Sequence, residues 1–170
     1  MLRLTIGLLV ATAALYGLSH IVAKQFGDQV VGRFLEHGAE SRHYTADSLA
    51  AWVSGNERDA RGYVIPVLFP IDLAFMASLA ALLATASLGV ASLSGRFAGI
   101  AWLFAVIPAT YLAADLMEDV LLAVFLLSPA RITSGVVEGA HVMTTLKIWT
   151  VGASILQIVG LAIVAAVWRR

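Results

Sequence analysis

The sequence predicts an all-α protein, a four-helix transmembrane bundle with a helical extramembrane loop between the first and second span. Of its 170 residues, 60% are hydrophobic and only 13% are charged, whereas about 25% are charged in soluble domains. Four apolar runs are each long enough to cross a hydrocarbon core of about 30 Å. These runs cover about 4–23, 63–93, 97–127 and 140–168, and the loop covers 24–62.

The composition also excludes several classes of function. The formal net charge is zero, so no nucleic-acid partner is expected. The chain has no cysteine, which rules out disulfides, cysteine-ligated zinc, iron–sulfur clusters and thiol catalysis. Phosphate-loop, nucleophile and zinc signatures are absent too. We therefore expect a single membrane domain, 1–170, that holds no cofactor and no metal.

The first apolar run, Leu4 to about Ala23, is interpreted as a retained membrane anchor. The charged start and the Ala-Thr-Ala at 11–13 resemble a signal peptide, but the run continues well past that point. The run also carries a stripe of small residues, namely Gly7, Ala11, Ala14 and Gly17. Such a stripe would let another helix approach closely, or it reflects only the tolerance of lipid for small residues.

The loop that follows is expected to form two short amphipathic helices on the membrane surface. Val30, Val31, Phe34 and Leu35 recur at helical spacing in the first of them. Thr45 or Asp47 would cap the second helix. That helix would carry Leu49, Trp52 and Val53, and it would end at Gly55-Asn56. Residues 57–61 would then form a polar turn.

Prolines and short polar breaks separate the remaining spans. Pro66 and Pro70 fall in the first turns of the second span, where they are expected to kink it. Residues 94–96 form a hinge, and Pro108 lies about halfway along the third span. Ser128-Pro129 ends that span, residues 131–139 form a second external loop, and Arg169-Arg170 follow the fourth span.

Four spans place both termini on one side of the membrane. Arginines lie on both sides of the predicted bundle, so the positive-inside rule gives no clear orientation. We expect cytoplasmic termini because the cations at 96 and 169–170 directly abut their helices.

Three carboxylates interrupt the third span, and every functional hypothesis depends on what neutralises them. Asp115 and Asp119 lie one helical turn apart, with Glu118 beside them and Tyr111 one turn earlier. The span contains fifteen Leu, Ile, Phe and Val residues. These favour insertion by about 7 kcal/mol in total, whereas three ionised acids at the helix centre would cost about as much or more.

Counting depth along the helices brings charges of three spans to one level. At about 1.5 Å per residue, Asp72 lies about 13 Å from the loop side, Lys147 about 10 Å and Asp119 about 12 Å. Two interpretations remain open: an ion pair of Lys147 with Asp119 or Asp115 that fixes helix register, or a functional polar pocket. The candidate site residues are Asp72, Tyr111, Asp115, Glu118, Asp119, Thr144 and Lys147.

One lysine cannot neutralise four acids. We therefore expect that at least one of Asp115, Glu118 and Asp119 is neutral at pH 7, or that donors such as Tyr111, Thr144 and His141 complete a network.

Other patterns in the fourth span are less specific. One face of the fourth span is polar. It consists of Thr144, Lys147, Thr150 and Ser154, with Gln157 at its margin. This face forms either a polar path or a set of hydroxyls that bond the backbone of their own helix. Glu138-x-x-His141 has the spacing found in di-iron bundles, but the chain holds no second such pair. A haem between His20 and His141 is geometrically conceivable, and interfacial histidines are the simpler interpretation.

Several short motifs resemble those of an uncharacterised family of small bacterial four-span integral membrane proteins. The matching residues, within about 50–155, are Arg61-Gly62-Tyr63, Phe69-Pro70 with Asp72, Asp115-x-x-Glu118-Asp119, and Thr145-Leu146-Lys147 with Trp149. The chain departs from the pattern at Asp119, where the family favours asparagine. The resemblance implies a four-span protein of the bacterial inner membrane with a polar cluster, and it implies no activity.

Three functions remain open, so the sequence leaves undecided whether the protein is an enzyme. The first is a non-catalytic membrane protein that interacts with the lipid bilayer, another membrane protein or a second copy of the chain. The second is an acid/base enzyme that acts on a lipid or other apolar molecule. The third is a subunit of a proton-coupled transporter.

Overall fold

The computed structural model describes residues 2–34, 45–93 and 97–168. Within these ranges, only the backbone of 26–34, 98 and 168 is described. Its elements are α1 (Leu2–Phe34), α2 (Ala46–Gly55), α3 (Glu57–Gly62), η2 (Tyr63–Asp72), α4 (Leu73–Leu93), η3 (Ala98–Ala105), α5 (Val106–Leu127), η4 (Pro129–Arg131) and α6 (Ser134–Trp168). Every element in these ranges is helical, which confirms the all-α prediction.

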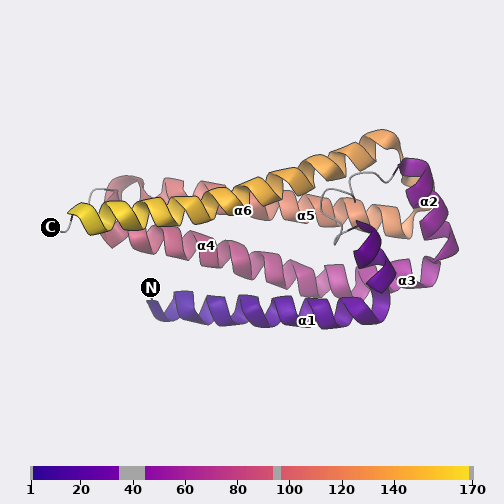
Figure 1. The fold of residues 1–170 in the computed structure, drawn as a ribbon, viewed down its shortest axis with the longest axis horizontal. Coiled ribbons are helices and arrows are strands. Elements are labelled where there is room, and N and C mark those ends of the chain that lie inside the picture. The colour runs from indigo at the N-terminus through magenta and orange to yellow at the C-terminus, as the bar shows by residue number, and fades with distance from the viewer. Residues whose placement is uncertain (1, 35–44, 94–96, 169–170) are drawn as a thin grey trace.

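Four stretches are long and apolar enough to cross a membrane, as predicted. They are Leu2–Gln25, Glu57–Leu93, Gly99–Leu127 and Ser134–Val167. The predicted loop over 131–139 is wrong in its second half, because α6 already begins at Ser134. In Figure 1, α1 runs beside α4, and α5 runs beside α6. Thr12 and Ser78 share a hydrogen bond of 2.8 Å between α1 and α4. The start of α1 and the end of α6 lie at one end of the bundle, and α2 and α3 lie at the other.

The main apolar core lies at the end that carries α2 and α3. Val53 of α2 and Phe125 of α5 are both 0% exposed there. The core also takes in residues of α1, α3, η2 and α6. Its buried members are Ala23, Leu49, Val53, Ala60, Tyr63, Val64, Val67, Leu68, Leu122, Phe125, Leu126, Val137 and Ala140. Helix α2 therefore closes one end of the bundle with its apolar face.

Helix α2 begins as the sequence predicts. The Thr45 hydroxyl accepts a hydrogen bond from the Ser48 backbone N–H at 3.2 Å, and the Ser48 hydroxyl accepts one from the Thr45 N–H at 3.0 Å. This reciprocal pair satisfies two donors that would otherwise be unpaired at a helix start. Thr45, and not Asp47, is the cap, and α2 ends at Gly55 as expected.

Two predictions for the loop were wrong. No separate first amphipathic helix forms, because α1 continues through Val30 and Val31 to Phe34. No proline interrupts this part of the chain, and each of its two glycines, Gly27 and Gly32, costs a helix only about 1 kcal/mol. Residues 57–61 belong to helix α3 instead of a polar turn, and Glu57 and Asp59 in its first turn favour that helix start.

Some predicted features lie outside the described residues. These are Leu35 in the loop, the hinge at 94–96 and the cationic end at 169–170.

The prolines of the second span break its helix twice. Ile65 (φ −130°, ψ 114°) and Phe69 (φ −128°, ψ 115°) are extended, because a proline clashes with a helical residue directly before it. Segment η2 is therefore irregular, and regular helix resumes only at Leu73. Asp72 lies at this junction, so the predicted kink sets the position of a charged residue.

The third span is divided as well, which corrects the expectation of one helix with Pro108 at its middle. Segment η3 is wound as a 3₁₀ helix up to Ala105, and Pro108 lies in the first turn of α5, where proline is tolerated. Proline has no N–H to donate to the carbonyl of Phe104. That carbonyl instead accepts a hydrogen bond of 2.7 Å from Gln157 Nε2 of α6.

Gln157 therefore joins three elements. Its Nε2 also donates to Ser87 Oγ of α4 at 3.0 Å. Ser87 is completely buried, so this amide satisfies polar groups that apolar surroundings would otherwise leave unpaired.

Replacing Gln157 with leucine is expected to destabilise the bundle by about 1–3 kcal/mol, because a buried acceptor loses its donor. Unfolding in a detergent titration would give this number, and hydrogen exchange should rise most in η3. Thr110→Val is the matched control, since the Thr110 hydroxyl donates to the Val106 carbonyl of its own helix and makes no other bond among the described residues. Equal stability of Gln157→Leu and the unaltered protein would refute this role.

Candidate functional site

An ion pair between α5 and α6 forms the centre of the candidate site. Lys147 Nζ lies 2.9 Å from Asp115 Oδ1 and 2.5 Å from Glu118 Oε2. The carboxyl side chains are 5% and 4% exposed, and the lysine side chain is 26% exposed. Thr144 Oγ1 donates to Glu118 Oε1 at 2.6 Å. The expected buried ion pair is therefore confirmed, with Asp115 as one of the two partners predicted for it.

The pairing follows from the register of two neighbouring helices. Asp115 and Glu118 are three residues apart on α5, and Thr144 and Lys147 are three residues apart on α6. Residues at this spacing share a helix face. Because the short connection through η4 makes the helices antiparallel, Glu118 meets Thr144 where Asp115 meets Lys147. Asp119 follows Glu118 and therefore points about 100° farther around α5. In the described part of the chain, no ion pair joins Asp119 to Lys147.

Two further acids lie beside this pair. Asp119 is 2% exposed, and its Oδ2 has no hydrogen-bond partner among the described residues. Asp72, at the end of η2, lies within electrostatic range of Asp115 and Glu118. In the described part of the chain no ion pair involves Asp72 or Asp119, so the cluster consists of an ion-paired part around Lys147 and two further acids.

Tyrosines border the cluster on two sides. Tyr111, on α5, is buried and lies within electrostatic range of Asp115. Tyr63 of η2 is also buried and lies within electrostatic range of Asp72 and Asp119. Tyr63 is not among the residues that the sequence predicts for the site, because counting depth along a straight helix puts it at the loop end. The motif Arg61-Gly62-Tyr63, which the chain shares with the four-span family that it resembles, is the sequence feature that could have added Tyr63 to the predicted site.

All seven sequence-predicted site residues therefore lie in one region on η2, α5 and α6. Within the described residues, no three Asp, Glu or His side chains come together as metal ligands would. Side-chain contacts pair Asp115 and Glu118 with Lys147 and Thr144. The geometry suits ion pairing.

The polar face of α6 is occupied by local hydrogen bonds. Thr150 Oγ1 donates to the Leu146 carbonyl at 2.8 Å, and Ser154 Oγ donates to the Thr150 carbonyl at 2.8 Å. Gln157 bonds Ser87 and Phe104. These contacts favour the interpretation that the hydroxyls satisfy backbone carbonyls over a polar path.

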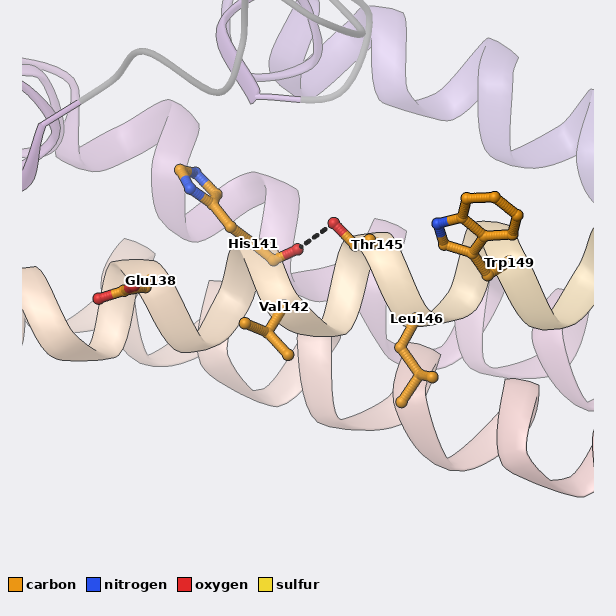
Figure 2. Close-up of a pocket in the computed structure, with 6 residues that line it drawn as sticks. All are labelled: Glu138, His141, Val142, Thr145, Leu146 and Trp149. Carbon is orange, nitrogen blue, oxygen red and sulfur yellow. Dashed lines mark hydrogen bonds between the residues drawn. The ribbon is translucent and has the colours of Figure 1, made fainter.

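A separate groove lies on the outer surface of α6. It has a volume of about 570 Å³ and is lined by Glu138, His141, Val142, Thr145, Leu146 and Trp149. Figure 2 shows His141 and Trp149 projecting from one side of the helix and Val142 and Leu146 from the other. The dashed bond is donated by Thr145 Oγ1 to the His141 carbonyl at 2.9 Å. None of the ion-pair residues lines this groove.

The other histidine of the haem alternative, His20, lies on α1. Its ring stacks on Tyr16 with 6.5 Å between centroids.

Comparison of the chain with protein-family profiles, with curated proteins and with solved structures gives no match. The roles of the site residues therefore follow from geometry and chemistry alone.

Replacing Lys147 with methionine is expected to destabilise the bundle by about 3–5 kcal/mol, because two buried carboxylates lose their cation. Adding Asp115→Asn and Glu118→Gln to the same chain should recover most of the loss. Both results can be measured by unfolding in a mixed-micelle titration. Arg61→Met is the control, since the Arg61–Glu57 pair is exposed and spans 3.9 Å. A triple variant that is no more stable than Lys147→Met would contradict the ion-pair explanation.

Proposed function

We propose that this chain is a non-catalytic integral membrane protein in which the charge cluster fastens the helices together and the groove on α6 binds a membrane lipid. We further propose that it lies in a bacterial inner membrane with cytoplasmic termini, like the four-span family that it resembles. The observation that carries the first proposal is the position of Lys147 between Asp115 and Glu118.

The contacts of the cluster support a structural role. Lys147 is engaged by two carboxylates, and Thr144 bonds one of them. A base held in this way is costly to release in an apolar layer, because each charge would lose its partner. An acid/base enzyme needs reactive groups that face a substrate cavity, but the groove on α6 is lined by other residues.

The groove suits an amphiphile that lies along the helix. Trp149 and Val142 are 74% and 54% exposed, and in a membrane such a surface is covered by acyl chains or by another helix. The polar residues Glu138 and His141 lie toward the loop-side end of the helix. A lipid with an amine headgroup, such as phosphatidylethanolamine, would place its ammonium near the Glu138 carboxylate and its chain along Leu146 and Trp149.

One observation favours the alternative of an acid/base enzyme or a proton-coupled transporter subunit. Asp119 is buried with an Oδ2 that has no partner among the described residues, and Asp72 lies within electrostatic range of it; two such acids can exchange protons. Glu118→Gln distinguishes the cases: it should abolish turnover or transport if the cluster is catalytic, and it should leave lipid binding intact if the cluster is structural.

Lipid binding can be tested by native mass spectrometry of protein released from bilayers of phosphatidylethanolamine and phosphatidylglycerol. The double variant Leu146→Ala/Trp149→Ala should retain several-fold less phosphatidylethanolamine, and Glu138→Gln should lose the preference for that lipid. Trp102→Ala is the control, because Trp102 is 65% exposed on η3, away from the groove. Unchanged lipid retention would refute the proposal, and a change in oligomeric state would identify a second copy as the occupant.

Orientation can be tested directly, because the chain has no cysteine of its own. Ala130→Cys lies between α5 and α6, and Leu2→Cys lies at the opposite end of the bundle. A membrane-impermeant maleimide added to intact cells should label Ala130→Cys, and it should label Leu2→Cys only after lysis. The reverse pattern would place the termini outside.

A further inference from the structure

A small apolar groove lies between the ends of α4 and α6. It has a volume of about 200 Å³ and is lined by Val90 and Leu93 of α4 and by Ala162, Ala165 and Ala166 of α6. The groove forms because α6 carries three alanines where larger side chains would fill the space beside α4. Pockets that enclose a whole drug-sized ligand have about 300–1,000 Å³. This smaller groove therefore suits part of a flexible chain.

The groove lies where α6 leaves the apolar layer. Helix α6 has 35 residues and is about 52 Å long, so it extends beyond a hydrocarbon core of about 30 Å. Ala162 lies about 9 Å before the end of the helix at Trp168. Ala162 and Ala166 are exposed, and Ala165 is buried. A lipid in the groove would therefore have its headgroup near the end of α6 and the upper part of one chain against the alanines.

The charged residues at this end of the bundle are basic. No Asp or Glu occurs at 1–27, 73–114 or 139–170. Arg3 is exposed at the start of α1, which lies at the same end of the bundle as the end of α6 (Figure 1). The remaining basic residues of these stretches are Lys24 at the other end of the first span, Lys147 in the ion pair, Arg169 and Arg170 after α6, and Arg96, which lies outside the described residues.

The two arginines that follow α6 lie close to the groove for a covalent reason. A chain spans at most about 3.6 Å per residue, so the Arg169 backbone is within about 11 Å of the Ala166 backbone in any conformation. An arginine side chain can bind a phosphate oxygen. No carboxylate of these stretches competes for the arginines, so this end of the bundle is complementary to an anion.

We propose that the groove between α4 and α6 holds an acyl chain of an anionic phospholipid, whose headgroup is bound by Arg169 and Arg170. Basic residues near a membrane surface attract anionic lipids. A zwitterionic lipid has the same chains and no net charge, so it fits the groove without this attraction. The site lies at the opposite end of α6 from the groove near Glu138, and it does not depend on a lipid there.

Photo-crosslinking of the full-length protein in phosphatidylcholine bilayers tests the charge preference. Two probes carry a diazirine in the same acyl chain, one on phosphatidylglycerol and one on phosphatidylcholine. Peptide mapping should find segment 162–166 labelled about tenfold more by the phosphatidylglycerol probe, as two basic residues near the surface imply. Arg169→Gln/Arg170→Gln should remove most of this preference. Arg131→Gln is the control, because Arg131 lies on η4 at the other end of α6.

Ala162→Leu tests the groove separately from the charge. The leucine should occupy the space beside α4 and reduce labelling of this segment by both probes several-fold, while both arginines remain. Ala13→Leu is the matched control, since Ala13 is an exposed alanine on α1. Leu146→Ala/Trp149→Ala should change neither result, which separates this site from the other groove. Equal labelling of the unaltered protein by the two probes, a preference that survives in the arginine variant, or undiminished labelling of Ala162→Leu would overturn the proposal.

Discussion

The low dielectric of the membrane layer is the constraint on which the rest of this structure depends. A charge there must be paired, and Lys147 is the base through which α6 meets the acids of α5. Removing either partner leaves a buried charge without compensation. The ion pair therefore fixes the register of two antiparallel helices. By fixing their rotation, it also determines which face of α6 is left for the surroundings.

The two faces of α6 serve different purposes. Thr144 and Lys147 point toward α5 and complete the charge cluster. Thr145, only one residue along, lines the outer groove with Trp149. Consecutive residues on a helix are about 100° apart, so one helix can hold the bundle together and present an exposed apolar surface. A change in the rotation of α6 would disturb both features at once.

Proline gives the bundle its second set of constraints. Each proline removes a hydrogen bond from a helix in a medium that offers no water as a substitute. In the third span, Gln157 replaces the missing donor at Phe104. In the second span, the breaks at Ile65 and Phe69 leave η2 irregular, and Asp72 at its end lies within electrostatic range of the acids of α5. The hydrogen bonds that proline removes thus lead to a side-chain link in one span and to an irregular, charged junction in the other.

The sequence by itself determined the number of spans, the all-helical architecture and the level of the charged residues. Hydropathy and a fixed rise per residue are properties of a single helix and need no neighbour. A helix start at Thr45 or Asp47 was predictable for the same reason, and the structure selects Thr45, whose partner Ser48 is three residues away.

Only the tertiary structure decided which acids meet Lys147, how far α1 extends and where Tyr63 lies. The choice of Glu118 over Asp119 depends on the rotation of α5 against α6, and the position of Tyr63 depends on two breaks in η2. Rotation about a helix axis is set by packing between segments distant in sequence. A linear pattern records depth along each helix, and it carries no information about which sides of two helices face each other.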